Sequence, residues 1–378
     1  MKALISMTIA SAMLTISCST MEKDLDNILN PLFPEGEPGG AVLVMKGDKV
    51  LYDKGFGIAD LVTGAGIDGE TSFNIASCSK QFTAMAVLQL AEEGKLSPED
   101  RIVDYFPEFL DHEGADSIWK EIRIKHLMSH SSGIPDARGY LTHEQRVYGD
   151  ETLATEYLRT LDHLNFTPGT QYEYINPTFV LLGQLVERVS GQEFTSYATE
   201  HLFTPAGMDR TVYFDRDHQE LIPDMAHGYD SSTEGNDSHR DWYEYDFGEE
   251  TFFATRPDGG IYSSTHELAK WEKALRSGKL LGKELQDEAW TAHTLVSGSR
   301  FSDYQNRPGT WYGYGWFLEK ESEDSDPRCI YHTGDNGGFK ALVARYPARD
   351  ALIVILANRA DWDRNEVKVR METVLGLR

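Results

Sequence analysis

Strand-forming segments lie at both ends of this 378-residue chain, and helix-forming segments fill its middle. Near the N-terminus, residues 41–45 and 50–52 flank a Lys-Gly-Asp-Lys turn, which is typical of a β-hairpin. Four apolar runs near the C-terminus are predicted as consecutive strands: 311–320, 329–332, 339–347 and 351–357. The economical architecture is one antiparallel sheet built from both ends of the chain.

Apolar periodicity predicts the helices of the middle, and amphipathic helices near each end are predicted to flank the sheet. The predicted helices are 21–33, 77–93, 124–131, 151–162, 178–190, one opening at the Ser264 capping box, and 361–377. We therefore predict an α/β (α+β) fold, with a sheet lobe at 21–75 and 300–378 and an inserted helical lobe at 76–299. A cleft between the lobes is the natural place for a site.

Residues 1–17 are typical of a secretory signal, because Lys2 precedes a short apolar run and then small residues. The apolar run is too short to predict a membrane span. Residues 15–18 resemble a bacterial lipobox, with Leu14 one place earlier than usual. We predict a periplasmic or cell-envelope lipoprotein whose single domain, 18–378, is anchored through Cys18. Soluble secretion is the alternative.

The net charge of −25 argues against nucleic acid and anionic head groups as partners. Cys78 and Cys329 do not make a disulfide framework, we expect no bridge between them, and Cys78 is predicted to be a small buried apolar residue. His126 and His130 have the i, i+4 spacing of shared metal ligands, but the segment lacks the glutamate of His-Glu-x-x-His. We interpret both histidines as structural and expect no metal and no cofactor.

Ser77 and Lys80 are a candidate nucleophile and base, because positions i and i+3 share a helix face. A serine hydroxyl needs a neighbouring base to take its proton, and a lysine serves only if its surroundings hold it neutral. A helix start also leaves the Ser77 N–H free to stabilise an oxyanion. Ser-x-x-Lys alone occurs by chance in many helices, so the assignment depends on the surrounding motifs.

Five motifs follow one another along the chain. They are Ala76–Thr83, Ile122–Pro135, Tyr174-Ile-Asn176 with Leu181-Leu-Gly183, Gly259–Ser263, and His332-Thr333-Gly334. In this order and spacing the chain resembles the serine β-lactamase and penicillin-binding-protein family, over roughly residues 25 to 375. The likeness is to the class C β-lactamase and D-alanyl-D-alanine carboxypeptidase branch, with its related esterases. The resemblance implies a β-lactamase/transpeptidase-like fold.

The resemblance also implies roles for individual residues. Tyr174 would relay the Ser77 proton to the leaving group and later activate water. Asn176 would hydrogen-bond the substrate and Lys80. The backbone N–H groups of Ser77 and Asp335 would form the oxyanion hole.

The last of the five motifs, His332-Thr333-Gly334, is predicted to bind substrate on a strand beside the cleft, where Gly334 allows close approach. His332 stands where many β-lactamases carry lysine, and it could donate to Tyr174 or to a substrate carboxylate. His-Thr-Gly is familiar in D-alanyl-D-alanine peptidases and related D-aminopeptidases and esterases. Asp335 would disfavour anionic substrates if its side chain faces inward.

These residues predict an exported serine hydrolase that forms a Ser77 acyl-enzyme with a small ester or D-amino-acid amide or peptide. A β-lactamase is the alternative, and a penicillin-binding sensor that acylates without turnover is a third hypothesis. The stretch 230–250 is predicted as a long surface loop. Its Trp242, Tyr243 and Tyr245 either wall the cleft or belong to a solvated excursion.

Overall fold

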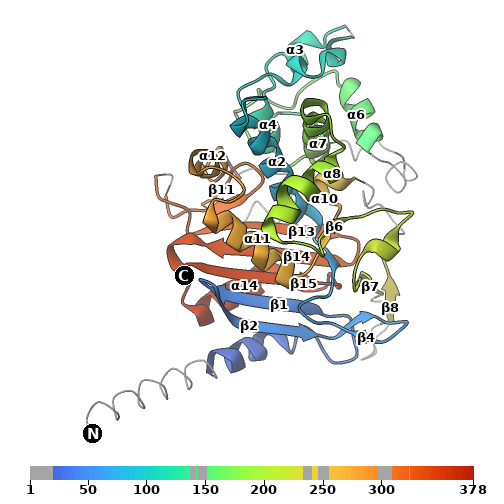
Figure 1. The fold of residues 1–378 in the computed structure, drawn as a ribbon, viewed down its shortest axis with the longest axis vertical. Coiled ribbons are helices and arrows are strands. Elements are labelled where there is room, and N and C mark those ends of the chain that lie inside the picture. The colour runs from blue at the N-terminus through green and yellow to red at the C-terminus, as the bar shows by residue number, and fades with distance from the viewer. Residues whose placement is uncertain are drawn as a thin grey trace.

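The computed structural model describes residues 20–111, 113–136, 142, 151–232, 241–245, 255–296, 309–322 and 324–378. The predicted signal segment and Cys18 lie outside these residues. Figure 1 shows a large sheet below a group of helices. Among the described residues, no helix combines the length and the apolar character that a membrane crossing requires.

The large sheet has eight strands, all paired antiparallel, and joins the two ends of the chain. In spatial order the strands are β10 (Thr294–Leu295), β11 (Thr310–Tyr312), β12 (Phe317–Glu319), β13 (Cys329–Asn336), β14 (Phe339–Tyr346), β15 (Ala351–Ala357), β1 (Gly40–Lys46) and β2 (Lys49–Phe56). The first strand pairs with the last, with Gly40 opposite Ala357 and Lys46 opposite Ala351. The predicted sheet from both termini is confirmed.

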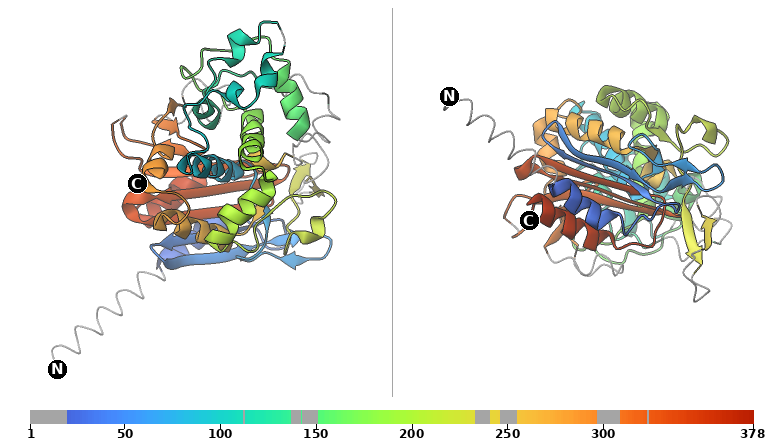
Figure 2. Two further views of the ribbon diagram at one scale, coloured as in Figure 1. Left: turned by 45° about the horizontal axis from the view of Figure 1, so that its top comes forward. Right: turned by 90° about the horizontal axis from the view of Figure 1, so that it is seen from below.

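Helices cover both faces of this sheet, which is why its central strands are apolar at nearly every position. Residues 20–29 and α14 (Arg364–Leu375) share one core cluster with Val42 and Ile353. On the other face, α11 (Thr265–Ser277) contacts β1 and β15. Figure 2, right, shows the first and last helices side by side on one face of the sheet.

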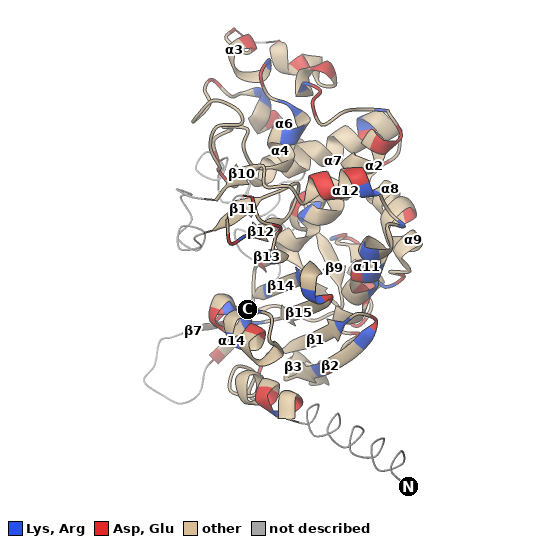
Figure 3. Ribbon diagram, turned by 90° about the vertical axis from the view of Figure 1, so that its left-hand side faces the viewer, with Lys and Arg blue, Asp and Glu red and all other residues tan. Residues whose placement is uncertain are grey.

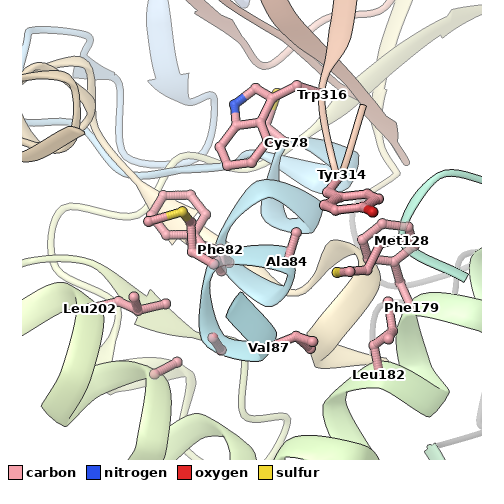
Figure 4. Close-up of a cluster of buried hydrophobic side chains, with 14 of the residues drawn as sticks. Cys78, Phe82, Ala84, Val87, Met128, Phe179, Leu182, Leu202, Tyr314 and Trp316 are labelled. Atoms are coloured by element: carbon pink, nitrogen blue, oxygen red, sulfur yellow. The ribbon is translucent and has the colours of Figure 1, made fainter. Parts of the chain in front are cut away.

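The remaining helices pack above the sheet around α2 (Lys80–Glu92). Figure 4 shows Ala84 of α2 on the side of Phe179 and Leu182 of α7 (Asn176–Ser190), and Phe82 on the opposite side of the helix, where Leu202 lies. Because neighbours surround α2, ten of its thirteen residues are buried, as expected for a helix without a solvent face. The site therefore begins on the most enclosed helix.

Shorter elements complete the described fold. The other helices are α3 (Asp116–Trp119), α4 (Ile124–Met128), α6 (Glu151–Arg159), α8 (Phe194–Ala198), α9 (Thr204–Ala206), α10 (Arg256–Gly259) and α12 (Lys283–Ala289). Single turns are η1 (Ala76–Ser79), η2 (Ile102–Asp104), η3 (Pro107–Leu110), η5 (Thr199–Phe203), η6 (Gln219–Leu221) and η7 (Pro347–Arg349). Small sheets pair β3 (Ile58–Asp60) with β4 (Ala65–Gly66), and β9 (Ile261–Ser263) with β5 (Phe73–Asn74) and β6 (Val212–Tyr213). Figure 3 shows charged residues gathered on outer helices such as α3, α12 and α14.

The prediction of a continuous surface loop over 230–250 is wrong for the part that the structure describes. Strands β7 (Tyr229–Ser232) and β8 (Asp241–Glu244) pair there in a two-stranded sheet. The hairpin is fixed to the main body, because the Tyr229 N–H donates to the Asn358 carbonyl at 2.9 Å and the Arg359 guanidinium stacks on Trp242 at 4.5 Å. Residues 233–240 and 246–250 lie outside the described part.

Candidate active site

Ser77 lies in η1, between strand β5 and helix α2, on a turn with an unusual backbone. Ala76 has φ 47°, in the left-handed region that costs a non-glycine residue about 1–3 kcal/mol. The turn keeps this conformation because the Ala76 N–H donates to Asn74 Oδ1 at 2.9 Å and the Ile75 N–H donates to the Ile261 carbonyl at 2.9 Å. Strained backbone of this kind concentrates at functional sites.

Lys80 is fully buried at the first position of α2, and its Nζ donates to Ser77 Oγ at 3.0 Å. The two side chains meet as the i, i+3 spacing predicts. The same Nζ donates to the main-chain oxygen of Asp258 at 2.7 Å and lies 4.9 Å from the centre of the Tyr174 ring. A lysine held this way, out of water and against the serine hydroxyl, can exchange a proton with it.

The structure places Tyr174 at the site, whereas the direction of the Asn176 side chain toward it stays a prediction. Tyr174 is buried beside Lys80, and its ring centre lies 6.3 Å from that of His332. Asn176 begins α7, and its Oδ1 is buried with no hydrogen-bond partner among the described residues. An acceptor left in this position can bind a donor from a substrate.

His130 supports this segment, a role that its i, i+4 spacing with His126 did not suggest. Its Nδ1 accepts the Ile175 N–H at 3.2 Å, and its ring lies 4.2 Å from the Tyr174 ring. Burial, and then the charges of Lys80 and His332, hold the pKa of His130 well below its usual value. The imidazole is therefore neutral, which agrees with its interpretation as a structural histidine. The signal was its place within the Ile122–Pro135 motif.

His332 is buried on β13, and both of its ring nitrogens lie within hydrogen-bond distance of a partner. Its Nδ1 lies 2.7 Å from the Thr333 carbonyl, which only accepts, so Nδ1 carries the proton. Its Nε2 lies 2.8 Å from the Tyr312 hydroxyl, which can either donate or accept. The sequence predicted a donor toward Tyr174 or a substrate carboxylate, and the structure instead turns Nε2 to Tyr312. Sequence reasoning missed Tyr312, which lies on a different strand, β11.

Gly334 brings β13 against the backbone that precedes Ser77. A Cβ on Gly334 would lie 2.2 Å from the Ile75 oxygen, so no other residue fits without a shift. The backbone that closely approaches Gly334 is therefore the turn of this chain that carries Ser77, which we call the nucleophile turn. Thr333 is buried beside it, with Oγ1 lacking a hydrogen-bond partner among the described residues. The oxyanion hole between Ser77 and Asp335 stays a prediction.

The Asp335 side chain points toward helix α14. Arg364 donates from Nη2 to Asp335 Oδ2 at 2.8 Å and from Nη1 to the Gly334 carbonyl at 3.0 Å. The acid is therefore neutralised outside the cleft, and the condition for repelling anionic substrates is not met.

Asp258 is a second residue that sequence reasoning missed. It lies in α10, 3% exposed, and burial raises the pKa of its carboxyl to about 6, against the opposing charge of Lys80 and a hydrogen bond from Thr255. The available signal was an acid directly before the Gly259–Ser263 motif. Two opposite charges thus share the enclosed space behind Ser77.

The described residues contain one cluster with the spacing of metal ligands, formed by Glu319, Cys329 and Glu372. Lys368 Nζ donates to carboxylate oxygens of both glutamates at 2.8 Å. A cationic side chain therefore already holds the place that a metal would take.

The Beta-lactamase family model matches residues 26–376, nearly the whole chain. The chain belongs to the beta-lactamase family. Penicillin-binding protein 4* of Bacillus subtilis (strain 168) is 28% identical over 353 residues, which cover 90% of this chain and 72% of that protein. Protein flp of Staphylococcus aureus (strain MW2) is 27% identical over 341 residues, covering 89% of this chain. The chain spans 63% of the length of Protein flp.

Two solved structures of other proteins share the fold of this beta-lactamase family member. EstCE1, described as a hydrolase with promiscuous acyltransferase activity, superposes with a TM-score of 0.75 at 19% identity, covering 95% of this chain and 99% of that one. The D-amino acid amidase of Ochrobactrum anthropi SV3 superposes with a TM-score of 0.73 at 20% identity, covering 95% and 97%. The predicted fold class is confirmed.

Proposed function

We propose that this beta-lactamase family member is a serine hydrolase that forms a covalent Ser77 acyl-enzyme with an ester or a D-amino-acid amide or peptide. The observation that carries the proposal is the 3.0 Å hydrogen bond from Lys80 Nζ to Ser77 Oγ, made by a lysine with no exposed surface. Tyr174 beside Lys80 provides the second proton carrier that acyl transfer needs.

In the proposed reaction, Lys80 and Tyr174 take the proton from Ser77 Oγ while this oxygen bonds to the substrate carbonyl carbon. The carbonyl oxygen becomes an oxyanion, which the N–H groups of Ser77 and Asp335 would stabilise. The alcohol or amine then leaves as it receives the proton from Tyr174. A water molecule attacks the acyl-enzyme by the same route, which releases the acid and restores Ser77. Proton transfer by placed groups contributes about 10²–10⁴-fold to such a step.

The choice of an ester or D-amino-acid amide over a β-lactam depends on His332. His332 stands where many β-lactamases carry lysine, and a buried imidazole bonded to Tyr312 and Thr333 lacks the permanent positive charge that a lysine offers to a β-lactam carboxylate. The amidase and the acyltransferase-active hydrolase among the fold neighbours support the same choice. β-Lactam hydrolysis is the alternative, and stable acylation without turnover is the alternative from a non-enzyme class.

The test compares a p-nitrophenyl short-chain ester, a D-alanine anilide and a chromogenic cephalosporin, each with wild type, Ser77→Ala and the remote control Ser277→Ala. We expect wild type to turn over the ester or the anilide fastest. Ser77→Ala should lower this turnover rate by at least about 10³-fold, and Ser277→Ala should leave it unchanged. Full activity in Ser77→Ala would contradict the nucleophile. Fastest turnover of the cephalosporin would favour the β-lactamase, and stable labelling by fluorescent penicillin without product release would favour the sensor.

We also propose that the protein is exported and anchored through a lipid on Cys18, on the strength of the N-terminal sequence. We expect the wild-type protein to incorporate radiolabelled palmitate and the Cys18→Ser variant not to. We also expect globomycin to block cleavage of the signal segment. An unmodified soluble product in the wild type would contradict the anchor and favour soluble secretion.

A further inference from the structure

The Asp258 carboxyl is a buried acid that the proposed acylation does not use. It is 3% exposed, and its Oδ1 has no hydrogen-bond partner among the described residues. The main-chain oxygen of Asp258 accepts a hydrogen bond from Lys80 Nζ at 2.7 Å. The carboxyl group therefore belongs to a residue that is in direct contact with the proposed base. A carboxylate enclosed so close to a lysine acts on that lysine's proton.

Helix α10, which carries Asp258, is held in place on several sides. Thr83 Oγ1 of α2 donates to the Pro257 carbonyl at 2.5 Å. Arg256 Nε donates to Glu151 Oε1 at 2.9 Å. A Cβ on Gly183 of α7 would lie 2.3 Å from Pro257 Cγ, which shows how closely the two helices pack. These contacts prevent the carboxyl from turning outward to water.

The charges around Asp258 come from the elements that contact α10. Lys80 of α2 favours the ionised carboxyl, and Glu151 of α6 opposes it. Glu151 is itself paired with Arg256, and Glu187 of α7 also acts on that guanidinium. Turn η1 contributes no charged residue. Lys80 is therefore the cation that faces Asp258 most directly, and their protonation states are linked.

We propose that Asp258 is a positioning residue that holds the proton on Lys80 and so sets the lower end of the pH range in which Ser77 is acylated. The inference rests on the proposed function, in which Lys80 takes part in removing the serine proton. An ionised Asp258 favours the ammonium form of Lys80, because opposite charges stabilise each other. Burial that raises the pKa of Asp258 to about 6 makes this influence change near neutral pH.

The sign of the expected effect follows from this charge. Removing the carboxylate removes the attraction that keeps Lys80 protonated, while the burial that disfavours the ammonium stays. Lys80 then loses its proton at a lower pH, so the acid limb of the profile moves to lower pH. A nearby opposite charge shifts a pKa by about one unit or more. Acylation at a pH above about 6, where Asp258 is ionised, and still below the limb should then be about tenfold faster in Asp258→Asn than in wild type, and the two should converge at lower pH.

The experiment measures kcat/KM against pH for the ester, together with the acylation rate by fluorescent penicillin, in wild type, Ser77→Ala, Asp258→Asn and Asp258→Ala. Glu272→Gln is the matched control, because Glu272 is another buried acid of raised pKa, on α11 beside Arg345. We expect the acid limb to move down in both Asp258 variants and to stay in Glu272→Gln. Thermal unfolding identifies any variant that fails to fold.

Three outcomes would overturn the inference. An acid limb that stays in place in a folded Asp258 variant, while activity still depends on Ser77, would overturn this inference alone. An equal shift in Glu272→Gln would show that loss of any buried acid suffices. Activity that survives Ser77→Ala would overturn the proposed function and the inference with it.

Discussion

Gly334→Ala should damage catalysis by displacing the turn that carries Ser77. The new Cβ would lie 2.2 Å from the Ile75 oxygen and 3.1 Å from the Ala76 Cβ. Because real Cβ contacts essentially never fall below 3.0 Å, β13 and the turn must separate by about 0.8 Å. A misplacement of about 1 Å can cost about 100-fold in rate, which corresponds to about 2.7 kcal/mol in the activation free energy. Overpacking of this kind also lowers the free energy of unfolding by about 1–3 kcal/mol.

The chain offers a matched control in Gly259, which faces the same turn. A Cβ on Gly259 would meet the Ala76 carbonyl carbon at 3.8 Å, an ordinary contact. Stopped-flow acylation by a p-nitrophenyl ester and urea unfolding would be measured for Gly334→Ala and Gly259→Ala. We expect the large rate loss in the first and a change within about threefold in the second, which is less than 1 kcal/mol. A Gly334→Ala enzyme with wild-type rate and stability, or an equal loss in Gly259→Ala, would refute the reasoning.

Two further predictions concern buried groups outside the cleft. Lys368→Met should lower the free energy of unfolding by about 1.5–3 kcal/mol at pH 7, because it removes the charged hydrogen bond at 2.8 Å to the buried Glu372 carboxylate and leaves Arg328 Nη1 at 3.1 Å. Burial raises the pKa of Glu372, but the ion pair with Lys368 lowers it overall. The stability that the pair provides is therefore lost as the pH falls below the ordinary Glu pKa of 4.5. Urea unfolding curves of variant and wild type should converge at that low pH. A loss below about 0.5 kcal/mol at pH 7 would contradict the role of the pair. Burial raises the pKa of Cys78 and Cys329 to about 12, so iodoacetamide at pH 8 should label neither in a folded Cys18→Ser protein and both in urea, as counted by mass spectrometry. Labelling of Cys78 in the folded protein would show that the nucleophile turn opens.

The sequence could predict those features that depend on local spacing or on a small choice of topologies. The contact between Ser77 and Lys80 is local, because three residues of one helix bring both side chains to one face. The sheet from both termini follows from strand runs at each end, and β1 does pair with β15. Membership of the family, inferred from five ordered motifs, is confirmed by the match over residues 26–376.

The features that sequence reasoning missed depend on contacts between distant segments. Asp258 reaches Lys80 across 178 residues, and its acid has no signal in the sequence beyond its place in a turn. Tyr312 meets His332 only because β11, β12 and β13 are neighbours in the sheet. The pairing of β7 with β8 was hidden by a composition rich in acids and small residues, and contacts with Asn358 and Arg359 hold these strands in place.

The pairing of β1 with β15 has a consequence for how the chain is made. The Gly39 N–H donates to Asn358 Oδ1 across 319 residues, so the sheet that carries His332 cannot close until almost the whole polypeptide has left the ribosome. Proteins dominated by such long-range contacts fold slowly. A nascent chain of this kind stays open during synthesis, which suits the proposed export, since a secretory channel threads unfolded chains. It also means that a chain truncated before residue 351 would expose the edge of β1 to other chains.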